Sequence, residues 1–213
     1  MLSIENLKAA QLTNPNIVEY SLDLQTSKSE WQFPLLKNNV KLEQAGISWY
    51  EPFSHSFYGG LEVGYTELSQ ADNPMPSAQF TSGEYIGLLF RYAAVQQSAL
   101  SLNLHIKYRY NRTEGKSTLQ NSQFAWHETT FSSELVFHSS KNLNLILAAD
   151  YLQMGGEQRD SGNITQLTTF KNVQEKASYR AGIEFIPYRT GVIGIEWSSG
   201  IRDATKLYFK RKF

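Results

Sequence analysis

From Asn16 onward, apolar and polar side chains alternate along this chain with a period of two residues. The clearest stretch of this alternation runs from Leu100 to Asn111, where six apolar side chains alternate with six polar ones. Successive side chains of a β-strand point to opposite faces of the sheet. Hardly any window keeps the 3.6-residue period of an amphipathic helix. The alternation therefore predicts an all-β chain.

The same alternation recurs along the whole chain and predicts about ten strands, with boundaries uncertain by about two to four residues. No apolar run approaches the length of about 18 residues that a membrane-spanning helix requires, so no such helix is expected. The predicted strands are 18–24, 38–49, 60–66, 86–92, 100–111, 129–137, 143–151, 177–185, 193–197 and 207–213.

The connections between these strands alternate between short and long. Short links are expected at 52–56, 95–98, 139–141 and 188–191, and longer polar loops at 25–37, 70–83, 111–123 and 153–165, with a smaller loop at 199–204. Short turns on one side and long loops on the other are typical of an up-and-down barrel in an outer membrane. An even number of strands lets the last strand pair with the first, so no edge stays open.

We therefore predict a closed antiparallel up-and-down transmembrane β-barrel of about ten strands, within a range of eight to twelve. The barrel is expected to cover residues 17–213, and residues 1–16 to form an N-terminal periplasmic tail or a short plug segment. The opening residues do not have the pattern of a secretory signal. We expect a signal peptide to have been removed from the chain.

Aromatic side chains decide which face of the barrel meets lipid. The chain has 12 Tyr, 12 Phe and 4 Trp, and many of them fall near predicted strand ends, as in the two interfacial girdles of membrane barrels. A soluble lipocalin-like barrel, with the apolar face around a ligand, is the alternative that alternation alone leaves open. The girdle residues are Trp49, Phe57, Tyr92, Phe137, Phe185 and Phe213 on one side and Tyr65, Tyr108, Tyr110, Tyr151 and Trp197 on the other.

The opposite face of the strands carries charges of both signs. Barrels of eight strands have interiors almost filled by side chains, whereas porins of 16 to 18 strands leave an aqueous channel. About ten strands lies nearer the filled end, so an ion network closing the lumen is favoured over a narrow solute channel. The predicted lumen-facing network is Glu62, Glu84, Arg91, His105, Lys107, Arg109, Glu134, Arg180, Glu184 and Glu196.

The C-terminus carries a further signal. The chain ends on Phe213, with Phe209 and Leu207 at alternate positions before it. This resembles the terminal strand of Gram-negative outer-membrane β-barrel proteins, from which Arg211 departs because an apolar residue is usual there. The resemblance covers residues 17–213 and identifies no subfamily.

The resemblance implies location in the outer membrane and recognition of Leu207, Phe209 and Phe213 by the barrel-assembly machinery. It also implies contact with outer-membrane lipid and lipopolysaccharide, and a protein partner at the loops or the N-terminus. The expected function is a non-catalytic scaffold, a surface-interaction protein or a narrow, porin-like solute channel. Lys+Arg and Asp+Glu number 20 each, so no nucleic-acid partner is expected.

Few residues point to chemistry. The chain has no cysteine, and its four histidines show no HxH or HExxH spacing, so we expect no metal, no cofactor and no catalytic residue. The alternative is an outer-membrane hydrolase with a rim site. An omptin-like protease would use His127 with Asp150 or Asp160, and His138-Ser139-Ser140 resembles the His-x-Ser of lipid A 3-O-deacylases, although it falls at the predicted periplasmic rim.

Overall fold

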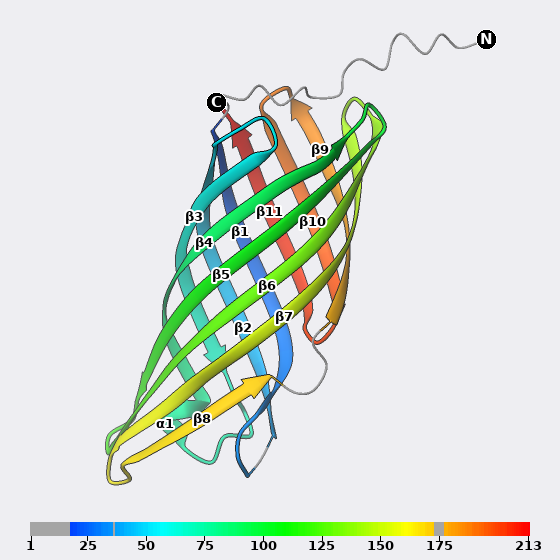
Figure 1. Cartoon of the computed structure of the whole chain (residues 1–213). Coiled ribbons are helices and arrows are strands. Elements are labelled where there is room, and N and C mark those ends of the chain that lie inside the picture. The colour runs from blue at the N-terminus through cyan, green and yellow to red at the C-terminus, as the bar shows by residue number, and fades with distance from the viewer. Residues whose placement is uncertain (1–17, 36, 173–176) are drawn as a thin grey trace, which may run out of the picture.

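The structure is a computed structural model that describes residues 18–35, 37–172 and 177–213. These residues form a tilted barrel of antiparallel strands with one short helix at one end (Figure 1). None of the described helices is long and apolar enough to cross a membrane. The elements are β1 (Glu19–Gln32), β2 (Lys37–Pro52), β3 (Phe57–Ser69), α1 (Pro76–Gln79), β4 (Phe80–Gln96), β5 (Leu100–Lys116), β6 (Gln120–Ser140), β7 (Leu143–Gly162), β8 (Gln166–Asn172), β9 (Ala177–Tyr188), β10 (Gly191–Gly200) and β11 (Asp203–Lys212).

Ten of the strands form a closed ring. Within this ring, each of β1 to β6 pairs with the strand that follows it, β7 pairs with β9, and β9, β10 and β11 pair in order. The ring closes where β1 pairs with β11, from Glu19 opposite Lys212 to Lys28 opposite Asp203. The predicted closed antiparallel barrel of about ten strands is thus confirmed.

Both described ends of the barrel chain lie at the same end of the ring, where the backbone N–H of Phe213 donates to the carbonyl of Val18. We call this the turn end. The links here are short, as predicted, and join β2 to β3, β4 to β5, β6 to β7 and β9 to β10. The N-terminal tail or plug segment predicted for residues 1–16 lies outside the described part of the chain.

At the opposite end most of the predicted long loops are wrong, because the strands continue through them. β1 extends to Gln32, β5 to Lys116 and β7 to Gly162, well beyond the tips of β10 and β11. We call the far part of the barrel, residues 29–35, 37–42, 68–81, 112–127 and 152–172, the extension.

The extension closes with fewer strands than the rest of the barrel. β8 follows β7 along its far half, from Gly155 opposite Lys171 to Asp160 opposite Gln166. The end of β8 then pairs with β1, where Trp31 lies opposite Asn172. β8 thus takes the place that β9, β10 and β11 occupy nearer the turn end, and a ring of eight strands stands on a ring of ten. Barrel diameter grows with strand number, so the wall narrows.

The side chains on the outer face are apolar in the ring of ten and polar in the extension. In the ring of ten, Leu22 and Leu24 point outward and are about half exposed, at 50% and 49%. Farther along β1, the outward side chains are Lys28 and Glu30, while Trp31 points inward and is fully buried. An apolar exterior suits hydrocarbon and a polar one suits water. The extension is therefore built like the closed end of a soluble barrel.

An aromatic core fills the extension. Phe170 of β8 stacks on Trp31, with ring centroids 4.6 Å apart and planes 11° from parallel. Phe33 packs on the same Phe170 ring at 5.2 Å, and Trp126 meets Trp31 edge-on at 5.3 Å. Such ring pairs contribute about 0.5–1.5 kcal/mol each beyond their buried area. The core consists of Trp31, Phe33, Val40, Leu42, Leu68, Ala78, Phe124, Trp126, Met154 and Phe170.

Candidate functional site: a charged lumen under an apolar seal

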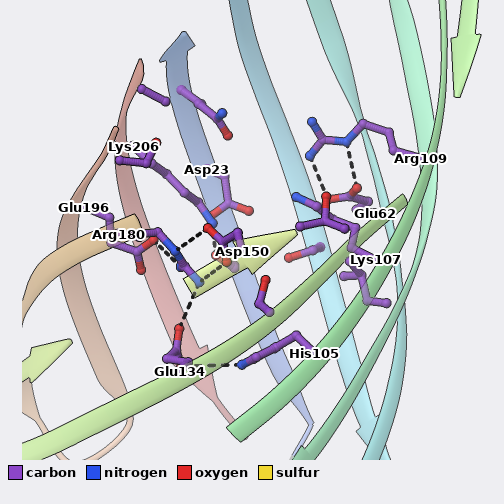
Figure 2. A pocket seen from close by; sticks show the side chains of 18 of the residues that line it. Asp23, Glu62, His105, Lys107, Arg109, Glu134, Asp150, Arg180, Glu196 and Lys206 are labelled. Carbon is purple, nitrogen blue, oxygen red and sulfur yellow. Dashed lines mark hydrogen bonds and ion pairs between the residues drawn. The ribbon is translucent and has the colours of Figure 1, made fainter. Parts of the chain in front are cut away.

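The lumen of the ring of ten is lined by ion pairs on neighbouring and facing strands (Figure 2). Arg109 of β5 makes a two-pronged contact with Glu62 of β3, with Nε and Nη2 at 2.8 and 3.0 Å from the two carboxylate oxygens. Its Nη1 donates to Gln44 at 2.8 Å. Because both charged partners are buried, removing either would leave the other uncompensated.

A second group of charges surrounds Arg180 of β9. Its Nη1 lies 2.6 Å from Glu196, and its Nη2 and Nε lie 3.4 Å from Glu134 and Asp150 respectively. His105 of β5 lies 3.5 Å from Glu134 on the other side. One guanidinium therefore holds three carboxylates from three strands, and Figure 2 shows them converging on it.

Smaller ion pairs complete the lining. Towards the turn end, Lys210 and the hydroxyl of Tyr208 both contact Glu184 at 3.0 Å. At the level of the extension, Arg202 of the β10–β11 turn donates to both oxygens of Glu128, at 2.9 and 3.1 Å. The remaining pairs are Arg91 and Lys212 with Glu19, and Lys206 with Asp23.

A cavity of about 210 Å³ lies among these groups. Lys107 lines it, and among the described residues no hydrogen bond or ion pair joins the Lys107 ammonium. Where the cavity meets the extension, Glu128 accepts a hydrogen bond from the indole nitrogen of Trp126 at 2.9 Å. Trp126 belongs to the aromatic core. The charged layer thus borders the apolar core at this point, and buried Gln44, Thr66 and Asn111 form a polar cluster beside it.

Nine of the ten residues predicted to face the lumen do so, but Glu84 does not. Glu84 is exposed and lies opposite Arg112 on the outer face of β4 and β5. It has the same parity as the outward-facing Ile86, so the alternation itself places it outside. Its neighbour Tyr85 points inward instead, where the Arg109 guanidinium lies 4.2 Å above its ring.

Tyr85 depends on two glycines of the barrel wall. A side-chain carbon added at Gly46 of β2 or Gly64 of β3 would collide with the Tyr85 ring. The absence of side chains at these two positions lets the ring lie against the wall. Sequence alternation alone did not predict this close approach.

The predicted rim protease is not assembled. His127 is exposed on the outer face, whereas Asp160 is buried inside the extension and accepts from Ser122 and Gln158. Asp150 also points inward, towards Arg180. No cluster of three or more metal-ligating side chains occurs in the described ranges.

His138 finds partners that sequence reasoning missed. Its Nε2 lies 2.9 Å from the hydroxyl of Ser101 on β5, and its Nδ1 lies 2.9 Å from Oδ1 of Asn144 on β7. The predicted motif with Ser139 and Ser140 is therefore not how this histidine is bonded. The contacts join three strands, and no local spacing in the sequence signals them.

The C-terminal residues follow the predicted alternation. Leu207 and Phe209 point outward and are nearly half exposed. Arg211, which departs from the apolar pattern, places its guanidinium 4.9 Å from the centroid of the Phe213 ring. A cation held against an aromatic face is favourable, so the arginine is accommodated at the turn end. Recognition of this segment by an assembly factor stays a prediction.

Comparison with solved structures shows which kind of barrel fold this chain has. No protein-family model matches the sequence, and no curated protein matches it either. The protease OmpT of Escherichia coli is similar in structure, with a TM-score of 0.54 and 8% identity over 94% of this chain and 98% of that chain. The translocator domain of the autotransporter NalP of Neisseria meningitidis gives a TM-score of 0.50 and 10% identity over 98% and 94%.

An outer-membrane channel of Pseudomonas putida has a TM-score of 0.51 and 8% identity over 93% of this chain and 96% of that chain. All three are Gram-negative outer-membrane β-barrels. This chain therefore has the fold of an integral outer-membrane β-barrel. At such low identity the likeness concerns the fold and not the activity.

Proposed function

We propose that this protein is a closed, non-conducting barrel of the Gram-negative outer membrane whose extension stands outside the cell as an interaction surface. The observation that carries the proposal is the aromatic core of the extension, seated across the lumen above the charged layer. Trp31 and Trp126 are at most 1% exposed there. A filled apolar core does not pass hydrated ions, so a narrow solute channel is the weaker alternative.

The outer surface supports this placement. The apolar band of the ring of ten fits the hydrocarbon core of a membrane, and the polar exterior of the extension fits water. With the turn end in the periplasm, the extension projects beyond the outer leaflet and its lipopolysaccharide. The outward-facing Leu207, Phe209 and Phe213 then form the strand that the barrel-assembly machinery would recognise.

The tip of the extension supports a role in binding. Leu119, Ile164 and Leu167 are 64%, 53% and 58% exposed. The turns that carry the first two are tied together, because the Gln120 side chain bonds both the N–H and the carbonyl of Ile164, and the Asn163 N–H donates to the carbonyl of Leu119. Clustered apolar side chains rimmed by polar groups mark protein-binding surfaces.

Conductance tests the seal. The full-length protein is refolded, inserted into a planar bilayer, and shown by protease protection to span it. We expect no current steps from the wild type, and discrete steps from the double variant Trp31→Ala/Trp126→Ala, which removes the two largest side chains of the seal. Steps of equal size from both proteins would refute a closed lumen and establish the narrow channel.

Surface display tests the interaction role. Cells displaying the protein are scored for aggregation with one another and for adherence to collagen-coated glass. We expect Leu119→Asp/Ile164→Asp to abolish the response, while Leu35→Asp leaves it unchanged, because Leu35 is equally apolar, 97% exposed and on another turn. If displaying cells behave like cells without the protein in both assays, the interaction role is rejected for these partners.

A further inference from the structure

The lumen holds a second chemical arrangement near the turn end, outside the cavity described above. Ser101, His138, Asn144 and Glu184 come from β5, β6, β7 and β9, which are consecutive neighbours in the ring. Their side chains form a continuous chain of hydrogen bonds with lengths of 2.9 Å at every step. The donor and the acceptor of each hydrogen bond in this chain can be assigned.

The direction follows from Glu184. An ionised carboxylate only accepts hydrogen bonds, and Lys210 and Tyr208 already donate to its Oε1. The amide nitrogen of Asn144 must therefore be the group that donates to Oε2. This leaves the Asn144 carbonyl oxygen facing Nδ1 of His138.

The histidine tautomer is then fixed. The Asn144 oxygen is an acceptor, so Nδ1 of His138 carries the proton and Nε2 of the neutral ring has its lone pair free. That lone pair faces the hydroxyl of Ser101, which donates to it. A serine hydroxyl on the basic nitrogen of a histidine, whose other nitrogen is held by a third side chain, is the arrangement of a serine nucleophile and its general base.

Access to the serine is open. Ser101 and His138 are both partly exposed, whereas Asn144 and Glu184 are buried. The outward neighbours Leu104 and Phe137 lie on the opposite face of the same strands, so the hydroxyl faces the aqueous lumen and not lipid. The chemical groups that react are exposed and the groups that orient them are not.

We propose that Ser101 and His138 are the nucleophile and general base of a hydrolase that acts on short-chain carboxylic esters entering from the turn end, with Asn144 and Glu184 as positioning residues. The Ser101 oxygen attacks the ester carbonyl carbon while its proton passes to Nε2 of His138. His138 then gives that proton to the leaving alkoxide as the ester C–O bond breaks. Water repeats the sequence on the acyl-serine and releases the acid.

This inference revises the expectation of a protein without catalytic residues. It also differs from the predicted His-x-Ser motif, because the serine comes from another strand. It does not depend on the extension or on the seal, so a failure of the conductance or adherence tests would leave it standing.

Covalent labelling tests the proposal. The full-length protein, inserted in lipid vesicles, is treated with a fluorophosphonate, whose fluoride an activated serine displaces. We expect one label per chain, located at Ser101 by peptide mass analysis. Ser101→Ala and His138→Gln should lower the labelling rate at least tenfold, whereas Ser139→Ala and Ser140→Ala, which alter the serines next to His138, should not change it. Hydrolysis of p-nitrophenyl butyrate should follow the same order.

The positioning role has its own measurement. Asn144→Leu removes the acceptor for Nδ1 and should slow labelling. Asn144→Asp/Glu184→Gln keeps an acceptor for Nδ1 and places an amide donor opposite the new carboxylate, so labelling should recover. Heat-modifiable mobility on a gel verifies that each variant is folded. An inserted wild-type protein that takes no label, or a label that stays after Ser101→Ala, would overturn the proposal.

Discussion

The buried contact between Arg109 and Glu62 offers the sharpest test of the lumen. Arg109→Met removes three hydrogen bonds, two to Glu62 and one to Gln44, and leaves the Glu62 carboxylate, only 4% exposed, without its hydrogen-bonded cation. Breaking a buried ion pair by removing one partner lowers stability by about 3–5 kcal/mol. We therefore expect a loss of this size in the free energy of unfolding.

The double variant Glu62→Met/Arg109→Met should recover most of the loss, because replacing both partners by apolar side chains is often neutral. Urea unfolding in lipid vesicles, followed by tryptophan fluorescence, gives both values and hence the coupling energy of the pair. If Arg109→Met alone lowers the free energy of unfolding by less than about 1 kcal/mol, water must screen the pair, and the costly burial of an uncompensated Glu62 carboxylate would be refuted.

Three further outcomes are expected. Leu104→Arg, on the outer face, should lower the free energy of unfolding in vesicles by about 2–4 kcal/mol, whereas Asn103→Arg, beside Glu134 inside the lumen, should have a smaller effect, and equal losses would contradict the assignment of faces. Gly46→Ala should displace the Tyr85 ring, whose hydroxyl is the atom nearest to the added carbon, and lower the melting temperature, with a smaller loss in the Tyr85→Ala background. Trp31→Ala should lower the free energy of unfolding by about 3–5 kcal/mol, and a loss under about 1 kcal/mol would mean that the aromatic core is loosely packed.

The sequence was most informative where the barrel has one apolar and one charged face. The alternation from Leu100 to Asn111 correctly predicted β5 and the inward direction of Arg109, because the two faces meet different surroundings. The turn-end links were predicted for the same reason, since the pattern stops there. The ring of ten strands follows from these two signals.

The extension was mistaken for loops because its pattern is reversed and its core is assembled from distant segments. Trp31 and Phe33 stand at alternate positions within a polar stretch, and they become buried only when Phe170 packs on them. A local window contains Trp31 but not the ring that covers it. The polar residues of the same stretch therefore led to the prediction of a solvated loop.

The candidate sites show two further limits. Glu84 shares the outward parity of Ile86 and was assigned to the wrong face, whereas the room that lets the Tyr85 ring lie against the wall comes from Gly46 and Gly64 on other strands. Ser101 and His138 are 37 residues apart in the chain and meet only through the register of β5 with β6. Pairing registers and wall shape are properties of the assembled barrel, and a single strand does not encode them.

The change from ten strands to eight has a mechanical consequence. A lumen closed by a folded-in loop has a hinge, and a ligand or a voltage can swing that loop aside. Here the proposed closure is a narrowing of the hydrogen-bonded wall, filled by side chains from its strands together with Ala78 of α1. Opening it requires strands to separate or the aromatic core to come apart. On the proposed closure, movements confined to the turn-end links would leave the passage shut.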